Sequence, residues 1–348
     1  MAKLEELIYI YESSIKKNVR NKKKLFEFEK YKMEYFAYIL ELINSGNYDG
    51  GRYNIFLIYE PKIRLIMSEN ICDKIINHYI ARFILEVKLT KYLSNCNVAT
   101  RKNMGLDYGI KLLKKNIEKN KKYGDFYFLK IDISKYFYSI DHNILKNLLI
   151  DKLTNEEYKL VSSVIDSTNK EYINNKISTL GVDIRYSYGK GLPIGNMTSQ
   201  FLAIFYLYKL HHYIIHNLHI NSLVVYMDDY LLIHPDRNYL KYCLDKIEDI
   251  LCKDYLLNVS KNKTYIKSMK EGVKFLGYNI KVVNNKTIIN ISKSSKVKIK
   301  KNVKKIKYLQ DNKKISFDKS FTSINVIKNS FKFCKDKTIE NIINKYWY

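Results

Sequence analysis

The stretch LVVYMDDYLLIH, residues 223–234, places two adjacent acids, Asp228 and Asp229, between two apolar runs of β character. It predicts a strand–turn–strand hairpin over residues 222–234. Burying strands this apolar normally excludes carboxylates. At the turn, however, the two acids can project together into a cleft, where cations would offset their mutual repulsion.

A third acid of the same kind is Asp132, which ends the apolar run FYFLKIDI, residues 126–133. If this strand lies beside the hairpin, the three carboxylates converge. Such a set suits two Mg²⁺ ions about 3.5–4 Å apart, which activate a hydroxyl nucleophile and stabilise a leaving pyrophosphate. Hard oxygen ligands favour Mg²⁺, with Mn²⁺ as the alternative ion. The competing interpretation is solvent-exposed turn acids, which the second strand-end acid disfavours.

The charge balance points to a polyanionic partner. Among 348 residues, 61 are basic and 35 acidic, a net charge of +26. Nucleic acid is favoured over a membrane surface, because no run of 18 apolar residues occurs.

The five cysteines form no CxxC pair, which argues against disulfides and zinc, and no cleavable signal pattern begins the chain. A cytoplasmic setting is expected. The histidines at 211, 212, 216 and 219 are not interpreted as metal ligands.

Periodicity predicts a mixed chain. Helices are expected over residues 4–44, 70–93, 105–121, 142–170, 196–217 and 238–254 and from 293 onward; extended segments are expected over 56–67, 126–133, 222–234, 273–283 and 287–291. Asp141 is predicted to cap a helix rather than bind metal. This order favours an α+β core sheet with helices packed on one side.

Five segments in order resemble the sequence boxes of bacterial and phage reverse transcriptases, over about residues 50–310. They are KIDISKYFYSIDH (130–142), GLPIGNMTSQ (191–200), YMDD (226–229), SKNKT (260–264) and FLGY (275–278). The resemblance implies a right-hand polymerase with an antiparallel palm sheet backed by helices. It also implies three parts: an N-terminal helical extension (1–49), fingers and palm (50–290) and a short, basic helical thumb (291–348).

The resemblance assigns the chemistry to a few residues. Asp132, Asp228 and Asp229 would hold the metals together with the backbone carbonyl of Ile133. Lys263 would donate a proton to the leaving pyrophosphate or bind phosphate. Phe137, five residues after Asp132, stands where the family has a steric gate that selects deoxynucleotides. Tyr136 is the rival for that role, and a core aromatic is the alternative reading.

Further residues are implied to bind the nucleotide. EPKIR at 60–64 resembles the fingers box that clamps the triphosphate, so Lys62 and Arg64 are candidates, Arg64 being favoured because guanidinium binds phosphate bidentately. Gly195 and Gln200 would approach the template–nucleotide pair. Arginine is scarce, with seven against 54 lysines, which makes Arg101 a second candidate. The arginines at 20, 52, 82, 185 and 237 could equally be surface residues.

Two segments are implied to hold nucleic acid. Phe275, Leu276, Gly277 and Tyr278 resemble the primer-grip hairpin. Residues 293–307 carry eight lysines, with Ile299, Val303 and Ile306 on one apolar face. The opposite, basic face would contact the backbone of the template–primer duplex, through the lysines at 296, 300, 301 and 304. Binding there would be salt-sensitive and largely independent of sequence.

The expected activity is RNA-directed DNA polymerisation, with template RNA, primer or cDNA and dNTPs as partners. Ile194-Gly195 and Ser199-Gln200 resemble diversity-generating retroelement enzymes, which would bring a small basic accessory protein or a structured RNA as a further partner, and also some defence-associated (anti-phage) enzymes. An RNA-dependent RNA polymerase is disfavoured by Phe137. A catalytically inactive, basic RNA-binding scaffold is disfavoured by the intact acids.

Overall fold

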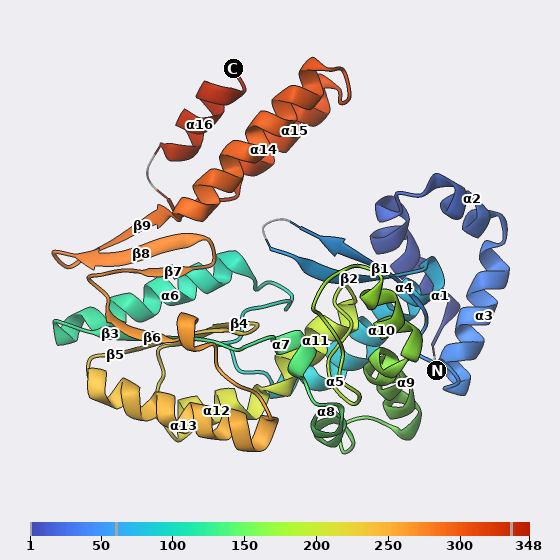
Figure 1. Ribbon diagram of the computed structural model, residues 1–348, viewed down its shortest axis with the longest axis horizontal. Coiled ribbons are helices and arrows are strands. Elements are labelled where there is room, and N and C mark those ends of the chain that lie inside the picture. Colours follow the sequence, from blue (N-terminus) through green and yellow to red (C-terminus); the bar gives the residue numbers. More distant parts are fainter. Residues whose placement is uncertain (1, 60–61, 335–336) are drawn as a thin grey trace.

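The four-stranded palm sheet is the centre of the molecule (Figure 1). The computed structural model describes residues 2–59, 62–334 and 337–348. The sheet has the order β4-β5-β3-β6, and every pairing is antiparallel. Its strands are β3 (Tyr127–Asp132), β4 (Leu223–Tyr226), β5 (Asp229–His234) and β6 (Tyr265–Ser268). The predicted hairpin and the predicted strand ending at Asp132 are both confirmed.

Helices cover both faces of the palm sheet (Figure 1). Leu129 and Leu232 face a core shared with α13 (Arg237–Tyr255), whereas Phe128 and Leu231 face a second core shared with α6 (Leu106–Asn120). The prediction of helices on one side only was therefore wrong. The reason is that these strands are apolar at successive positions, so each face of the sheet must be covered.

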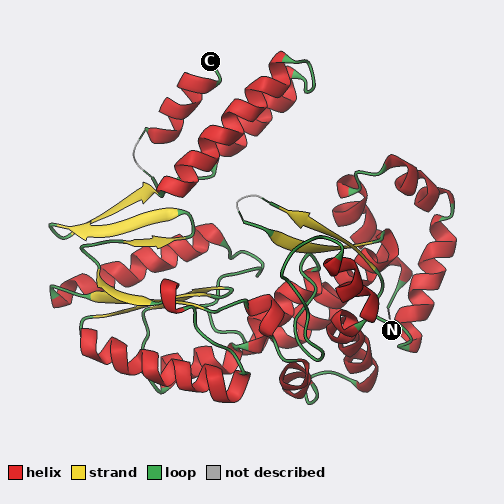
Figure 2. Cartoon of the chain, viewed as in Figure 1, coloured by secondary structure: helices red, strands yellow, loops and turns green. Residues whose placement is uncertain are grey.

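The fingers are a two-stranded hairpin beside a helical layer (Figure 2). Strand β1 (Tyr53–Ile58) pairs with β2 (Arg64–Glu69), and α4 (Ile71–Tyr79) follows. The N-terminal helices share one core with α4, through residues such as Leu7, Phe36 and Ile76. The continuous helix predicted over residues 4–44 is instead broken, because Val19 is extended and Asn21 caps a new helix through the backbone N–H of Lys24.

The remaining helical segments connect these layers. The helices are α1 (Leu4–Ile10), α2 (Lys22–Lys30), α3 (Lys32–Ser45), α5 (Glu86–Leu89), α7 (Tyr136–Ser139), α8 (His142–Leu149), α9 (Asn155–Ile165), α10 (Glu171–Ser178), α11 (Met197–Tyr206) and α12 (Tyr208–His216). Two π-helical segments span Tyr11–Ile15 and Ile80–Leu85, and short 3₁₀ turns span Lys16–Asn18, Thr90–Tyr92, Lys121–Tyr123, Asp166–Asn169 and Lys261–Lys263. Asp141 accepts hydrogen bonds from the backbone of Asn143 and Ile144, which confirms it as the cap of α8.

A second sheet carries the thumb. Strands β7 (Val273–Phe275), β8 (Tyr278–Val283) and β9 (Lys286–Ile291) form a three-stranded antiparallel sheet. The helices α14 (Lys293–Asp311), α15 (Phe317–Asn329) and α16 (Thr338–Tyr346) stand above it in Figure 1 around a small core that includes Val303, Ile324 and Trp347. The fold is therefore that of a right-hand polymerase, with fingers, palm and thumb.

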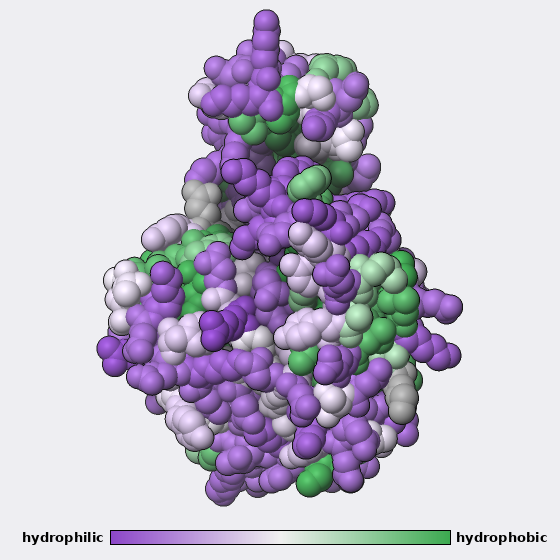
Figure 3. Space-filling view, turned by 90° about the vertical axis from the view of Figure 1, so that its right-hand side faces the viewer, coloured by the Kyte–Doolittle hydropathy of each residue, from purple (hydrophilic) through white to green (hydrophobic). Residues whose placement is uncertain are grey.

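Hydrophilic side chains cover much of the face seen from the side of the N-terminal helices (Figure 3). Hydrophobic patches interrupt them on both flanks and on the thumb at the top. In the described part of the chain, no helix is both long and apolar enough to cross a membrane.

One buried histidine makes the stability of the palm depend on pH. His211 on α12 is 1% exposed, and its Nε2 lies 2.8 Å from the hydroxyl of Tyr230, next to Asp229 in β5. Burial lowers the pKa of His211 from 6.5 to about 3. Below pH 6.5 the unfolded chain therefore binds a proton at His211 that the folded chain does not bind. Stability is lost as pH falls from 6.5 towards 3.

We expect the His211→Phe variant to lose less stability on acidification than the wild type, by up to about 1.4 kcal/mol per pH unit within that window. Denaturant titrations at several pH values measure this difference. His216→Phe, at an exposed position of the same helix, is the control. Parallel pH profiles for the wild type and His211→Phe would contradict the assignment.

Candidate active site

The three aspartates lie at one end of the palm sheet. Asp132 is the register partner of Asp229 across β3 and β5, and Asp229 is also the partner of Tyr226 across β4 and β5. The connecting turn is Met227-Asp228, with Met227 in the left-handed region at φ 57°. The backbone N–H of Ile133 donates to the carbonyl of Asp228 over 3.2 Å, which ties the turn to the end of β3. The predicted convergence of the three acids is therefore a property of the strand register.

Two lysines neutralise part of this acidic cluster. The Nζ of Lys263 lies 2.5 Å from Oδ1 of Asp132, and the Nζ of Lys130 lies 3.2 Å from Oδ2 of Asp229. Burial raises the pKa of Asp229 to about 6, although Lys130 acts in the opposite direction. Burial, with a smaller contribution from the charge of Asp132, also raises the pKa of Asp228. The cluster therefore holds more negative charge than its environment favours.

The carboxylate oxygens suit a hard cation, but the side chains are not arranged as a complete metal-binding site. In the described parts of the chain, no group of three or more His, Cys, Asp or Glu side chains is arranged to hold a metal. Yet Oδ1 of Asp229 is buried and has no hydrogen-bond partner. A buried carboxylate oxygen without a partner is unfavourable unless a cation or a donor reaches it. Divalent metal binding here would require the two lysines to move aside.

A cavity of about 610 Å³ opens beside the aspartates. The predicted residues Arg64, Ile133, Phe137, Asp228 and Lys263 all line it. Arg64 comes from the fingers strand β2 and Lys263 from the turn before β6, so the fold brings together residues about 200 positions apart in sequence. The cavity lies where a substrate would reach the acids.

The aromatic pair at the cavity separates into a core residue and a half-buried one. Tyr136 is 3% exposed, and its hydroxyl donates to the carbonyl of Ala203 over 2.6 Å. Phe137 is half-buried, with its ring 6.0 Å from that of Tyr136. Both rings line the cavity. The hydroxyl of Tyr136 is held in the core by its hydrogen bond, whereas Phe137 has no hydroxyl that needs a partner. This geometry favours Phe137 over Tyr136 as the residue that meets a sugar.

Three charged residues of the cavity wall were not predicted: Lys135, Asp183 and Arg185. Arg185 was grouped with arginines that could equally be surface residues. It lies between α10 and α11, six residues before the start of GLPIGNMTSQ and outside every motif that the sequence analysis recognised. The scarcity of arginine was the one available signal, and it applied equally to all seven.

Four residues predicted to bind nucleotide do not line this cavity. Lys62 is exposed, and the adjoining Glu60 and Pro61 of its motif lie outside the described residues. The guanidinium of Arg101 donates to the carbonyls of Ser94 (2.8 Å) and Asn97 (3.2 Å). The prediction for Arg101 is therefore corrected: its Nη1 holds the loop before α6. Gly195 and Gln200 are exposed at the start of α11.

The loop before α11 is fixed to the fingers by its backbone. The N–H of Met67 in β2 donates to the carbonyl of Ile194 over 2.8 Å, and Asn196 donates to the hydroxyl of Tyr53 over 3.1 Å. Gly195 has φ 128°, and a β-carbon there would lie 3.0 Å from the carbonyl oxygen of Met67. The close backbone approach predicted for Gly195 is thus made to β2, and it sets the position of Gln200 one turn later.

The predicted primer-grip residues form the β7–β8 turn. Leu276 and Gly277 both have positive φ, as a two-residue hairpin turn requires, and this turn splits the predicted extended run 273–283 into two strands. The rings of Phe275 and Tyr278 are buried in the core behind the sheet, and burial raises the pKa of Tyr278 to about 12. The turn residues Leu276 and Gly277 are half-buried, and the carbonyl of Gly277 accepts hydrogen bonds from the N–H of Ser292 and the hydroxyl of Ser295 at the base of the thumb.

The thumb lysines lie on α14 as predicted, with Ile299 and Val303 buried on the opposite side. Lys300 and Lys304 are exposed, and their Nζ atoms lie 5.0 and 4.8 Å from the ring centre of Tyr346 in α16. Lys301 is also exposed, whereas Lys296 is half-buried and donates to the hydroxyl of Thr338 over 3.3 Å. Part of this basic face is therefore packed within the thumb.

Comparison with known proteins agrees with the geometry. The family described as reverse transcriptase (RNA-dependent DNA polymerase) matches residues 60–280. A putative COX1/OXI3 intron 2 protein of Saccharomyces cerevisiae is 24% identical over 216 residues, which cover 45% of this chain and 24% of that protein.

Solved structures of telomerase share the fold. Apo telomerase from Candida tropicalis truncated from the C-terminal domain superposes with a TM-score of 0.51 at 15% identity, covering 68% of this chain and 55% of that chain. Apo telomerase from the same organism gives 0.50 at 15% identity, covering 74% and 51%. The chain thus spans about a quarter of the intron protein and about half of each telomerase chain.

The Lys130–Asp229 ion pair predicts a measurable change in the pKa of Asp229 when Lys130 is replaced. Removing the ammonium by Lys130→Met should raise the pKa of Asp229 further above its present value of about 6, because the opposing positive charge is lost. An NMR titration of the labelled Asp229 carboxyl carbon measures it. Lys267→Met, on the neighbouring strand β6, is the matched control. An unchanged or lower pKa in Lys130→Met would contradict this account of the cluster.

Proposed function

The chain belongs to the reverse transcriptase (RNA-dependent DNA polymerase) family, and we propose that it is itself an RNA-directed DNA polymerase that makes cDNA on an RNA template. The observation that carries the proposal is the register pairing of Asp132 with Asp229, next to a cavity lined by Arg64, Phe137 and Lys263. This arrangement places the carboxylate of Asp228 and the cationic groups of Arg64, Arg185 and Lys263 around one cavity.

The proposed chemistry is two-metal nucleotidyl transfer. Asp132, Asp228 and Asp229, with the carbonyl of Ile133, would hold two Mg²⁺ ions, which when bound supply activation of the primer hydroxyl and neutralisation of the phosphates. Lys263, now 2.5 Å from Asp132, would turn to the leaving pyrophosphate and donate a proton or a charge-assisted hydrogen bond. Mn²⁺ is the alternative ion, because the donors are the same hard oxygens.

The cavity wall suggests how the nucleotide is held. Arg64 and Arg185 would bind phosphate oxygens, since guanidinium groups suit bidentate contacts with phosphate. Phe137 would stand against the ribose and exclude a 2′-hydroxyl. Gln200, Gly195 and the turn at Leu276 and Gly277 would contact the template or primer outside the cavity, and Lys300, Lys301 and Lys304 would contact the duplex backbone.

The biological setting we propose is a diversity-generating retroelement, from the Ile194-Gly195 and Ser199-Gln200 pattern, with a defence-associated enzyme as the alternative. A template and variable repeat pair beside the gene would support the retroelement. Flanking sequence without such a pair would rule out the diversity-generating retroelement. An inactive RNA-binding scaffold is the alternative of another class, which the next experiment separates.

We expect the wild type to extend a primer on an RNA template with dNTPs and Mg²⁺, and Asp228→Asn to lose the activity by a factor of about 1,000 or more, because a metal ligand is removed. Asp245→Asn, an exposed position on α13 with the same chemical change, should retain full activity. Extension by Asp228→Asn at the wild-type rate would refute the proposed site, and a wild type that binds RNA without extending a primer would favour the scaffold.

The sugar gate has its own test. Phe137→Ala should gain ribonucleotide incorporation relative to deoxynucleotide incorporation by about tenfold or more, because the ring no longer meets the 2′-hydroxyl. The ratio of kcat/KM for rNTP and dNTP on the same primer measures it. Phe26→Ala, an exposed position on α2, should leave the ratio unchanged. No gain in Phe137→Ala would assign the ring to the core only.

A further inference from the structure

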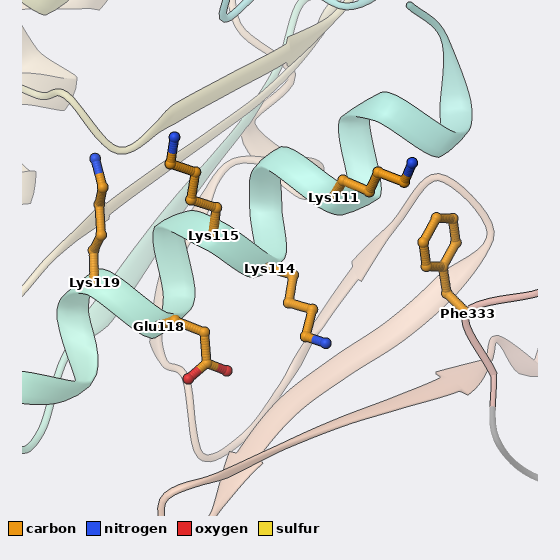
Figure 4. A pocket seen from close by; sticks show the side chains of 6 residues that line it. All are labelled: Lys111, Lys114, Lys115, Glu118, Lys119 and Phe333. Carbon is orange, nitrogen blue, oxygen red and sulfur yellow. The ribbon is translucent and has the colours of Figure 1, made fainter.

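A basic surface lies on α6 (Figure 4), and none of the residues that line it lines the cavity beside the aspartates. An open hollow of about 670 Å³ is lined there by Lys111, Lys114, Lys115, Glu118, Lys119 and Phe333. One side of α6 carries Ile110, Leu113 and Ile117 into the core behind the palm sheet. The lysines occupy the opposite, exposed side. The helix is therefore fixed in place by its apolar face and presents its charges outward.

The lysines form one stripe rather than a scatter. Lys111, Lys115 and Lys119 follow each other at intervals of four residues, which places them on one face over about 12 Å of helix axis. Within the described residues, none of these three lies within ion-pair distance of a carboxylate. The positive charge of the stripe is therefore available to a partner.

Glu118, the one acidic residue that lines the hollow, already has hydrogen-bond partners. Glu118 accepts hydrogen bonds from Lys121 and from the hydroxyl of Thr287 in β9, each over 2.8 Å. The bond from Lys121 holds the pKa of Glu118 below its usual range, and Thr287 acts in the same direction. The four lysines of the hollow thus outnumber a single, internally bonded carboxylate, and the surface is complementary to a polyanion.

The hollow adjoins the sheet that carries the region proposed to hold the primer. On the buried face of α6, opposite the lysines, a β-carbon at Gly109 would lie 2.8 Å from the side chain of Leu276 in the β7–β8 turn. Phe333, at the other margin of the hollow near Lys111, follows the thumb helix α15 and packs edge-on against Tyr278 with ring centres 6.2 Å apart (Figure 4). Phe333 therefore connects the hollow on α6 to the sheet that carries the β7–β8 turn.

We propose that the α6 surface binds a structured RNA outside the polymerase cleft, with the lysine stripe on the backbone phosphates and Phe333 against an unpaired base. Spacing of several cations along one line suits successive phosphates, and an aromatic ring at its end suits stacking of a base. A basic accessory protein would be repelled by the same charges. The identification of this RNA as part of the template rests on the proposed function, whereas the binding itself does not.

The test compares two triple variants with the same change of charge. Lys111→Gln, Lys115→Gln and Lys119→Gln together remove the stripe; Lys22→Gln, Lys23→Gln and Lys24→Gln together remove three exposed lysines of α2. The probe is an RNA hairpin with a single-stranded flank, titrated at several salt concentrations. We expect the α6 variant to bind more weakly and to lose about two units of the slope of log affinity against log salt. The α2 variant should keep the wild-type slope.

A second readout separates this inference from the proposed function. Extension of a short primer–template that does not reach beyond the cleft should be the same in the α6 variant and the wild type. Wild-type affinity in the α6 variant, or an equal loss in both triple variants, would overturn the inference. If the wild type extends no primer but the α6 variant shows the expected loss of RNA binding, the polymerase proposal is refuted and the α6 inference is supported.

Discussion

The register between β3 and β5 is the constraint on which the rest of the site depends. Because side chains alternate along a strand, a slip of one residue would turn Asp132 or Asp229 to the other face and replace it with an apolar neighbour. The register is held by the two apolar cores on either side of the sheet, which fix Phe128 and Leu231 to one face and Leu129 and Leu232 to the other. The fold thus uses hydrophobic packing to align carboxylates.

That alignment has an electrostatic cost that the surrounding residues reduce. Three acids at the end of a buried sheet repel each other and lose hydration, as the raised pKa values of Asp228 and Asp229 indicate. Lys130 and Lys263 offset part of the cost, and one oxygen of Asp229 remains buried without a partner. Met227 adds backbone strain, since a residue with a β-carbon is disfavoured at positive φ. Strain and unpaired charge gathered at one turn are expected where a site is kept ready for cations.

The sequence predicted the elements better than their assembly. The strand at Asp132, the hairpin at Asp228 and the cap at Asp141 follow from local patterns, and the structure contains all three. The coverage of both sheet faces was missed, because an apolar run does not say which neighbours will cover it. Arg101 was chosen over Arg185 although Arg185 lines the cavity, since which arginine reaches it depends on how the segment before α11 folds over the palm. The break in the N-terminal helix was missed, although the apolar spacing through Ile15 and Val19 is interrupted by Lys22, Lys23 and Lys24.

The proposed chemistry requires Asp132 and the Asp228-Asp229 turn to share divalent metal. The most direct measurement is anomalous X-ray scattering at the manganese edge, from crystals of the protein with primer, RNA template, a non-reactive dNTP analogue and Mn²⁺. We expect anomalous density between Asp132 and the turn, with the ammonium of Lys263 displaced from Asp132. Ordered nucleotide in the cavity with no anomalous density between these carboxylates would contradict it.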